Sequence, residues 1–588
     1  MKAKRMLALL LVLVLTVSAM AACGSSGAND SGSAEASAPA SETTTASAEA
    51  SASTDAGERE TLVINVLSEG ANYQGLQGGW YGKILKDKFN IELNITALSL
   101  SGESAYQTRL STGDLGDIVQ LGKDKMTYVV NNGLVRDIRS GFAQTSFLKE
   151  FLDPVQTVNN SMFPDKGEGI YVIPCNMTGT SPTEFTDTDL LISTKLRWDL
   201  YKELGEPDIA DLNGLLDVLE QMQKNHPVNE VGDSAYALSL WKDWDGFGMA
   251  NVTEPMRWYD QLMRGSLIFD SKTQELLPVT EKNTAYYKVL KFLNDAYLRG
   301  LVDPDSGTQD WSTVSTKIGN GQVYLLWYIF TKYAWNTEER KADGSHFLYI
   351  PVQDQKLYME ADIYYGAESY MGIGANVEGE KYERIMEFLD WYDGPENWRY
   401  SFGGIEGFNY EKNADGKNMI INPNAQADNL AVPEEYGGGG YADGMNQINF
   451  YFGHQNYIID PDTKEQYNYQ FWSSVLGEPS EMDREWQVRF GADNLVDYLK
   501  KNDMLDIGPN VVFALEPDTN DISVLRGQCQ ESFRDYSWKM VFAEDQAGFD
   551  ALWEEMAETL NGLGYEQLAA FDAANYASFV EATKEALR

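Results

Sequence analysis

The first regular pattern in the chain is an alternation of segments with strand and helix periods. Residues 61–67 and 91–98 are rich in β-branched residues or alternate between apolar and polar positions, which predicts strands. Residues 80–89 and 106–110 carry apolar side chains at helical spacing, and residues 117–121 form a further short apolar run. Strand, helix, strand, helix, strand predicts an open α/β sheet with crossover helices.

The alternation resumes later in the chain. We expect a helix over residues 195–204, with Thr194 as its N-cap and Gly205 as its C-terminal stop. Further amphipathic helices are expected at 211–224, 285–298, 381–392, 549–560 and from 566 onward, and short strands at 236–240, 323–327 and 347–350. A chain of 588 residues exceeds what one core organises, so at least two lobes are expected.

The N-terminus has the pattern of an export signal. Lys2, Lys4 and Arg5 precede a short apolar run at residues 7–17, which is too short for a membrane-spanning helix. The following Met-Ala-Ala-Cys sequence, ending at Cys23, resembles a bacterial lipobox. We therefore predict a signal peptide over residues 1–22 and lipidation of Cys23. A plain secretory signal cut near residue 22 is the alternative.

The segment after Cys23 has low complexity. Residues 24–58 consist mainly of Ser, Ala, Thr, Gly and Glu and show no hydrophobic period, so they cannot bury enough apolar surface to offset their ordering entropy. We interpret residues 23–58 as a tether, which as a flexible chain of about 35 residues spans roughly 30 Å. We therefore predict that the protein lies at the extracellular face of a cell membrane and that the lipid on Cys23 holds it there.

The net charge narrows the range of partners. The chain has 46 Lys and Arg and 89 Asp and Glu, a formal net charge of −43. Such a surface repels phosphate backbones and anionic lipid, which excludes nucleic acid as a partner and a membrane contact made by charge alone. Strongly acidic ligands are also disfavoured, unless a site concentrates its own Arg and Lys. A soluble, exposed surface accounts for most of this charge.

The cysteines and histidines show no pattern of a metal or redox site. Cys175 and Cys529 could pair or stand apart as small buried residues, and sequence leaves both readings open. No CxxC motif occurs, and the three histidines have no metal-binding spacing and no accompanying GxSxG motif. No cofactor and no metal are expected.

Several short blocks, taken in order, resemble a known family. They are STGDLGDIV at 111–119, NGLVRD at 132–137, GIYVIP at 169–174, RWD at 197–199, FLNDAY at 292–297, GLVDPD at 300–305 and GIEG at 404–407. Each block is weak alone, but their order is similar to that of the extracellular solute-binding proteins of ABC importers, in the large oligosaccharide-binding group. In the first block a Gly at position 116 replaces the usual Pro.

The resemblance implies a fold and a function. It implies a two-lobed α/β fold of the periplasmic-binding-protein type, with a hinge and an interlobe cleft that closes around ligand. It suggests a first lobe of residues 59–175 plus 310–350 and a second lobe of 176–309 plus 351–588. The implied partners are a small-molecule ligand, expected to be an oligosaccharide, and the transmembrane permease subunits of the importer, with the binding protein itself a monomer.

One feature of the family looks absent. Many relatives carry a calcium loop after the helix that corresponds to residues 211–224. Here residues 225–233 offer only Asn229, Glu230 and Asp233 as side-chain oxygen donors. Calcium prefers six to eight oxygens, so we expect this loop to bind no metal.

Sugar recognition needs aromatic rings for the apolar faces of the pyranose and planar polar groups for its hydroxyls. The chain has 14 Trp and 33 Tyr, and several lie where the family's cleft-lining segments fall. The candidate ligand-binding residues are Tyr73, Asn176, Trp241, Trp244, Trp327, Tyr328, Tyr365 and Glu406. For any single Trp, core packing is as good an explanation. We expect Trp80 and Trp258 to be core residues.

Two other functions are consistent with the same sequence features. An exported glycoside-active enzyme would need two carboxylates across a cleft, and nothing in the sequence marks out such a pair among the 89 acids. A surface binding or sensor module without a transporter would have the same fold. The ordered landmarks favour a binding protein over an enzyme.

Overall fold

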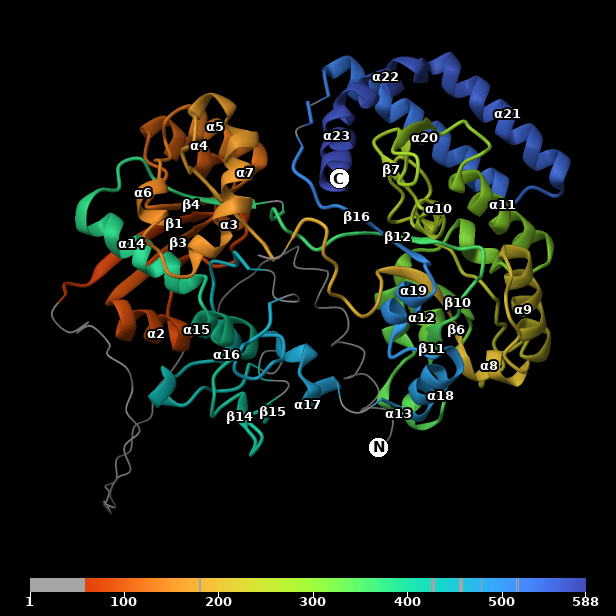
Figure 1. Cartoon of the computed structure of the whole chain (residues 1–588), viewed down its shortest axis with the longest axis horizontal. Helices are drawn as coiled ribbons and strands as arrows, with labels where there is room; N and C mark the ends of the chain where they lie inside the picture. Colours follow the sequence, from red (N-terminus) through yellow and green to blue (C-terminus); the bar gives the residue numbers. More distant parts are fainter. Residues whose placement is uncertain are drawn as a thin grey trace, which may run out of the picture.

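The computed structural model describes residues 59–588 except 179–180, 368, 423–424, 426–428, 454–457, 477–478, 514 and 517. Its helices and strands form two lobes that lie side by side, as Figure 1 shows. The predicted two-lobed α/β fold is confirmed. The lipidation site Cys23 and the tether lie outside the described residues.

The first lobe is built around a six-stranded sheet in the order β2-β3-β1-β4-β13-β5. Strands β1 (Leu62–Ser68), β3 (Ile91–Ala97) and β4 (Ile118–Gly122) are parallel, as the pattern predicted. Strand β13 (Ser369–Ile373) runs antiparallel to both β4 and β5 (Ile173–Pro174), and β2 (Gly75–Leu76) closes the other edge.

Helices cover both faces of this sheet. They include α2 (Gly79–Phe89), α4 (Glu103–Thr112), α5 (Lys123–Asn131), α7 (Leu152–Met162) and α14 (Gly379–Tyr392). The main core of the lobe joins residues from the first part of the chain with residues 371–467, so the segment after β13 belongs to the first lobe. Trp80 lies in this core, as expected.

The second lobe contains the antiparallel sheet β10-β6-β11, formed by β10 (Leu325–Tyr328), β6 (Ile192–Arg197) and β11 (Phe347–Tyr349). Isolated bridges join Tyr236 to Val323 and Leu238 to Val302, so residues 236–240 are extended beside this sheet. A second sheet, β7-β8-β9, consists of Gln261–Arg264, Leu267–Asp270 and Glu275–Pro278. Strands β12 (Leu357–Glu360) and β16 (Leu505–Gly508) pair in parallel.

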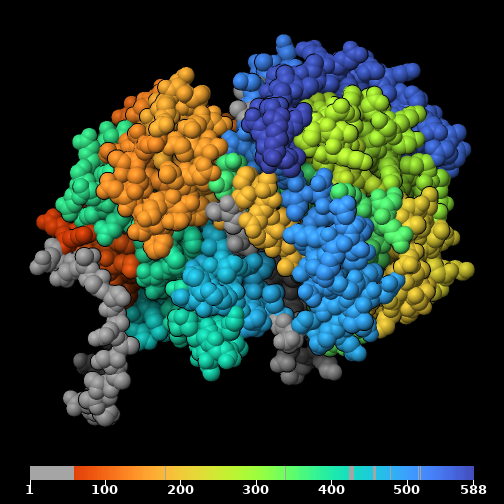
Figure 2. Space-filling model, in the orientation of Figure 1, coloured from red at the N-terminus to blue at the C-terminus, as the bar shows by residue number. Residues whose placement is uncertain are grey.

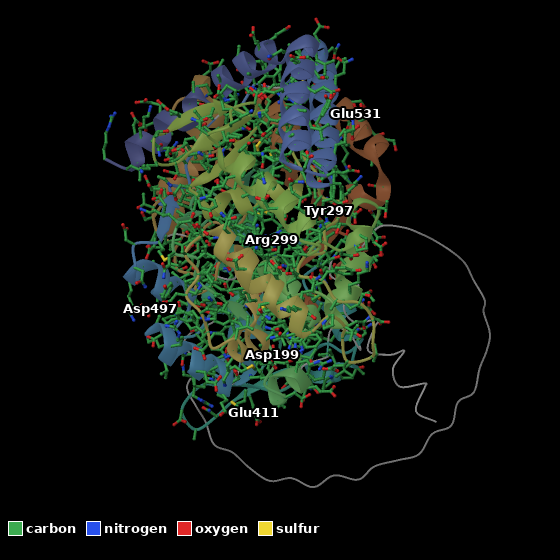
Figure 3. The ribbon with its side chains drawn as sticks, turned by 90° about the vertical axis from the view of Figure 1, so that its right-hand side faces the viewer. Asp199, Tyr297, Arg299, Glu411, Asp497 and Glu531 are labelled. Carbon is green, nitrogen blue, oxygen red and sulfur yellow. The ribbon has the colours of Figure 1, made fainter. Side chains whose placement is uncertain are left out.

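The helices of the second lobe surround these sheets. They include α8 (Trp198–Glu203), α9 (Leu212–Asn225), α11 (Ala285–Leu298), α18 (Glu481–Phe490), α19 (Leu495–Lys501) and the C-terminal α20 (Asn520–Val541), α21 (Gln546–Leu563), α22 (Tyr565–Asn575) and α23 (Ala577–Ala586). Their apolar faces share one core with residues 185–357, and Trp258 is fully buried in it. The acidic residues Asp497 and Glu531 lie on the outer side of this lobe (Figure 3).

Two predictions about this lobe need correction. The helix expected over residues 195–204 begins only at Trp198, because residues 192–197 form β6. Residues 310–350 had been assigned to the first lobe, whereas β10 and β11 both pair with β6 in the second. The first lobe is completed instead by the segment that begins with β13, since that strand pairs with β4.

The chain passes between the lobes three times. It leaves the first lobe after β5 and enters the second at β6, returns between β12 and β13, and crosses again between Tyr467 of the first core and Met482 of the second. The first two crossings are joined, because Thr186 donates to Asp362 and the Thr178 backbone donates to Ile363. Figure 2 shows the surface hollowed between the lobes at its upper and lower edges.

No helix among the described residues has both the length and the apolar content that crossing a membrane requires. The two cysteines in the described part of the chain, Cys175 and Cys529, form no disulfide and are buried in different cores.

Candidate ligand-binding cleft

Three extended segments of the second lobe each have one end at the edge that faces the crossings. Strand β6 begins there with Ile192, directly after the first crossing, and Tyr328 at the end of antiparallel β10 pairs with Ile192. The segment that ends at Leu240 runs parallel to β10. Loops at such strand ends commonly carry ligand-binding residues, so Trp241 and Tyr328 are brought together at the edge where a cleft is expected.

Six aromatic rings meet at this edge, and we call them the aromatic cluster: Trp241, Trp244, Trp311, Trp327, Tyr328 and Phe330. The Trp244 ring lies 5.1 Å from Trp241, 5.0 Å from Trp311 and 5.6 Å from Phe330, between centroids. Four of the eight candidate residues thus lie in one group.

The rings of the cluster divide into a buried and an open set. Trp241 and Trp327 are each 3% exposed, and Tyr328 is nearly as buried. Trp244 is 37% exposed and Phe330 is 39% exposed, and Trp311 is half-buried. The open rings provide an apolar surface for a flat ligand, while the buried rings support them from behind.

Polar groups fix the backbone around the open rings. The Asp243 carboxylate accepts a hydrogen bond of 2.7 Å from the Trp311 backbone, at the start of α12 (Trp311–Gly319). The Asn251 amide donates to the Trp241 carbonyl at 2.6 Å. Burial raises the pKa of Tyr328, so its hydroxyl remains neutral and can serve as donor or acceptor.

The first lobe presents the carboxyl ends of β1, β3 and β4 on its side of the crossings. There the Gln120 amide oxygen accepts hydrogen bonds from the Ser68 hydroxyl at 2.6 Å and from the Gly70 backbone at 2.8 Å. Glu69 accepts from the Gly122 backbone and pairs with Lys125, both at 2.7 Å. These bonds hold the loops at the strand ends in one arrangement.

Three further candidates lie in the first lobe or at the crossings, outside the aromatic cluster. Tyr73 is half-buried and its hydroxyl donates to the Leu76 carbonyl at 2.6 Å. Asn176 has a left-handed backbone (φ 59°) and its N–H donates to the Tyr451 carbonyl at 2.9 Å. Tyr365 packs edge-on against Tyr364, with centroids 4.8 Å apart.

Glu406 lies in a different place from the aromatic cluster. It is exposed on the first lobe, 3.8 Å from the Lys412 ammonium, and borders a cavity of about 200 Å³ beside α2. Its neighbours there include Tyr400 and Tyr436. The structure therefore separates Glu406 from the rings with which it had been grouped.

Trp311 and Phe330 were missed by sequence reasoning. Phe330 follows two residues after Tyr328 and could have been found from that position. Trp311 had no strand before it, and only the N-cap Asp310 marked its place at the start of a helix.

The loop that would hold calcium in the family does not fit that ion here. The Glu230 carboxylate forms an ion pair with the Arg340 guanidinium, which lowers the pKa of Glu230. The Asn229 side-chain oxygen accepts hydrogen bonds from the backbones of Val231 and Asp233. One of the two charged donors of the loop, Glu230, is therefore neutralised by an arginine. Across the described residues, no three His, Cys, Asp or Glu side chains are grouped to hold a metal.

No protein-family model matches the sequence, and no match was found among curated proteins. Solved structures do match. An HMO-binding, ABC-transporter-associated solute-binding protein from Bifidobacterium longum infantis is 13% identical with a TM-score of 0.55, and the match covers 88% of this chain and 99% of that one. An N-glycan transport solute-binding protein from Streptococcus pneumoniae is 15% identical with a TM-score of 0.51, again over 88% and 99%.

A further match is an extracellular solute-binding protein from Bifidobacterium longum subsp. infantis, 14% identical with a TM-score of 0.53 over 88% of this chain and 99% of that one. The fold is therefore that of the extracellular solute-binding proteins of ABC transporters. At these identities the likeness extends to the fold, and the ligand has to be argued from the site.

Proposed function

We propose that this protein is the membrane-anchored, extracellular substrate-binding subunit of an ABC importer, and that it captures an oligosaccharide by hinge closure. The observation that carries the proposal is the aromatic cluster, whose open rings lie at the strand ends of a two-lobed solute-binding fold. The anchor would be Cys23 and the partners would be the permease subunits.

The chemistry of the cluster suits a sugar. Stacking of one ring on a pyranose contributes about 1 kcal/mol beyond area burial. Two or three rings with several hydroxyl hydrogen bonds would offset the entropy lost when a flexible sugar is ordered. An affinity in the micromolar range, about −8 kcal/mol, is then expected.

The crossings between the lobes support the proposed closure. Ligand that contacts both lobes binds the closed state more tightly than the open one, and this differential affinity shifts the equilibrium toward closure. The closed form would be the state that the permease subunits recognise. We propose no catalytic role, since the HMO-binding protein and the N-glycan transport protein that this chain resembles are both solute-binding proteins by name.

The proposal is tested by calorimetry with a panel of neutral oligosaccharides on the purified protein, together with small-angle scattering. We expect micromolar binding of at least one oligosaccharide and a smaller radius of gyration in its presence. Binding of peptides or amino acids but of no oligosaccharide would leave a solute-binding role and refute the sugar assignment. Release of shortened sugars during incubation would refute the absence of catalysis.

A further inference from the structure

The second lobe contains a cavity of about 450 Å³ that the aromatic cluster does not line. It lies between the face of strands β6 and β11 and the helices α18 and α19, and its apolar walls include Phe347, Tyr349 and Trp486. A volume of this size is typical of small-molecule sites, and most such sites combine rings with a few polar groups.

Three charged side chains form the deep end of this cavity, and we call them the lysine–aspartate group: Lys195, Lys332 and Asp189. The Lys332 ammonium donates to one Asp189 oxygen at 2.8 Å, and the Lys195 ammonium lies 3.5 Å from the other. Two cations thus share one carboxylate, so the group carries a net charge of one positive unit.

The electrostatics of the group reflect this imbalance. Burial lowers the pKa of Lys195 to about 8, and neighbouring Lys332 lowers it further while Asp189 opposes the shift. Burial alone would raise the pKa of Asp189, but the two lysines lower it to about 2. Burial opposes the charge on Lys332, but Asp189, and after it Tyr333 and Asp483, raise the pKa of Lys332, so its ammonium stays charged. An anion placed beside this partly buried cation would stabilise it further.

The Lys332 ammonium also has N–H groups that a ligand could use. An ammonium has three N–H donors, and within the described part of the chain Lys332 uses one of them on Asp189. Its side chain is 20% exposed and that of Asp189 is 26% exposed, so both are reached from the cavity. Lys195 is almost fully enclosed, donates to the Ser193 hydroxyl, and acts as the charge behind Lys332.

The rim of the cavity is lined by a different set of polar residues from its deep end. It carries Lys341, Asp483 and Asp493 with Asn494. The Asp483 carboxylate already accepts from the Ser480 backbone and hydroxyl, at 2.8 and 2.7 Å. Carboxylates and an amide in the lining of the same cavity are suited to accept hydrogen bonds from ligand hydroxyls.

We propose that this cavity is a second ligand site, for a small hydroxylated monocarboxylate of the size of a sugar acid. The ligand carboxylate contacts Lys332, its ring or carbon body packs on Trp486 and Phe347, and its hydroxyls face the rim. The net charge of the chain disfavours acidic ligands, but the lysine–aspartate group places a local excess of one positive charge in this cavity, whose other charged lining residues are Lys341, Asp483 and Asp493. The site does not depend on the oligosaccharide role of the cleft.

The test compares glucuronate with glucose, which carries a neutral hydroxymethyl group in place of the carboxylate, by calorimetry and thermal shift on the purified protein at pH 7. Sodium chloride keeps the ionic strength equal. We expect glucuronate to raise the melting temperature and to bind at least tenfold more tightly than glucose. Lys332→Met should weaken glucuronate binding at least tenfold, whereas Lys282→Met, which alters an exposed pair with Glu554, should leave it unchanged.

Two further variants separate the possible failures. Lys195→Met should also weaken the binding of glucuronate. If Lys195→Met does not fold, because this lysine is enclosed, Lys332→Met still decides the test. Trp244→Ala alters the cleft and should leave glucuronate binding intact. The second site would be refuted if glucose and glucuronate bind equally well, or if Lys332→Met binds glucuronate as tightly as the unaltered protein. Neither result would contradict the proposed function of the cleft.

Discussion

The indole rings of Trp241 and Trp327 lie parallel, with 6.0 Å between centroids and 8° between planes. The two residues come from different strand ends, and both are buried. They form the inner layer of the aromatic cluster, and Trp244 packs edge-on against Trp241 from outside. Residues of the two layers should therefore respond differently to substitution.

Trp244→Ala should weaken oligosaccharide binding by about tenfold, since an exposed ring is lost from the ligand surface. Trp327→Ala should instead lower the free energy of unfolding by about 3–5 kcal/mol, because it leaves a cavity behind the cluster. Chemical denaturation and calorimetry on both variants measure the two effects.

A buried tryptophan remote from the cleft serves as the control. Trp553 packs against Tyr287 in the helical part of the second lobe. Trp553→Phe should reduce stability and leave the affinity of the folded protein unchanged. If Trp244→Ala binds oligosaccharide as tightly as the unaltered protein, the open rings are not the ligand surface.

Cys23→Ala should release the folded protein from the membrane fraction, because a lipid chain on this residue is the proposed anchor. Fractionation of cells followed by immunoblotting measures the distribution. Cys175→Ala, which changes a buried thiol of the first lobe, should stay in the membrane fraction. A membrane-bound Cys23→Ala variant would contradict lipidation at this site.

Chelation with EDTA should leave the melting temperature unchanged, within about 1 °C. The reason is that Arg340 neutralises Glu230 and the Asn229 oxygen is used by the loop backbone. A ligand that binds only the native state would otherwise raise the melting temperature. Differential scanning calorimetry with EDTA and with added calcium is the measurement, and a drop of several degrees that calcium restores would reveal a site.

Periodicity was sufficient to predict the parallel strands and most helices. The segment at residues 285–298 was predicted to the residue, because its buried side chains recur at helical spacing along one face. Strand β6 was missed because all six of its residues are buried, including Lys195 and Arg197, which leaves no alternation of apolar and polar positions.

The division into lobes depended on pairing that sequence order does not reveal. Residues 310–350 could equally have joined either sheet, and only the pairing of β10 and β11 with β6 places them. The ends of strands indicated Trp241 and Tyr328, but burial decides which rings are open. The lysine–aspartate group was not predicted, since its residues are far apart in the chain.

Asp393→Asn should stabilise the protein at neutral pH. The Asp393 side chain is fully buried at the end of α14, and burial with the nearby charge of Asp390 raises the pKa of Asp393 well above its ordinary value. The native state therefore holds a proton that the unfolded state releases. Stability is lost as pH rises above the unfolded pKa, near 4, and Asn removes this loss.

The expected gain is largest at pH 7 and becomes smaller toward pH 4, where the unfolded carboxyl is already about half protonated. Denaturation curves of the variant and the unaltered protein between pH 4 and 8 give the difference directly. Asp415→Asn, in an exposed turn of the first lobe, is the matched control variant. A difference for Asp393→Asn that is the same at every pH would mean that the carboxyl has the same pKa in the folded and unfolded states, which would contradict the prediction.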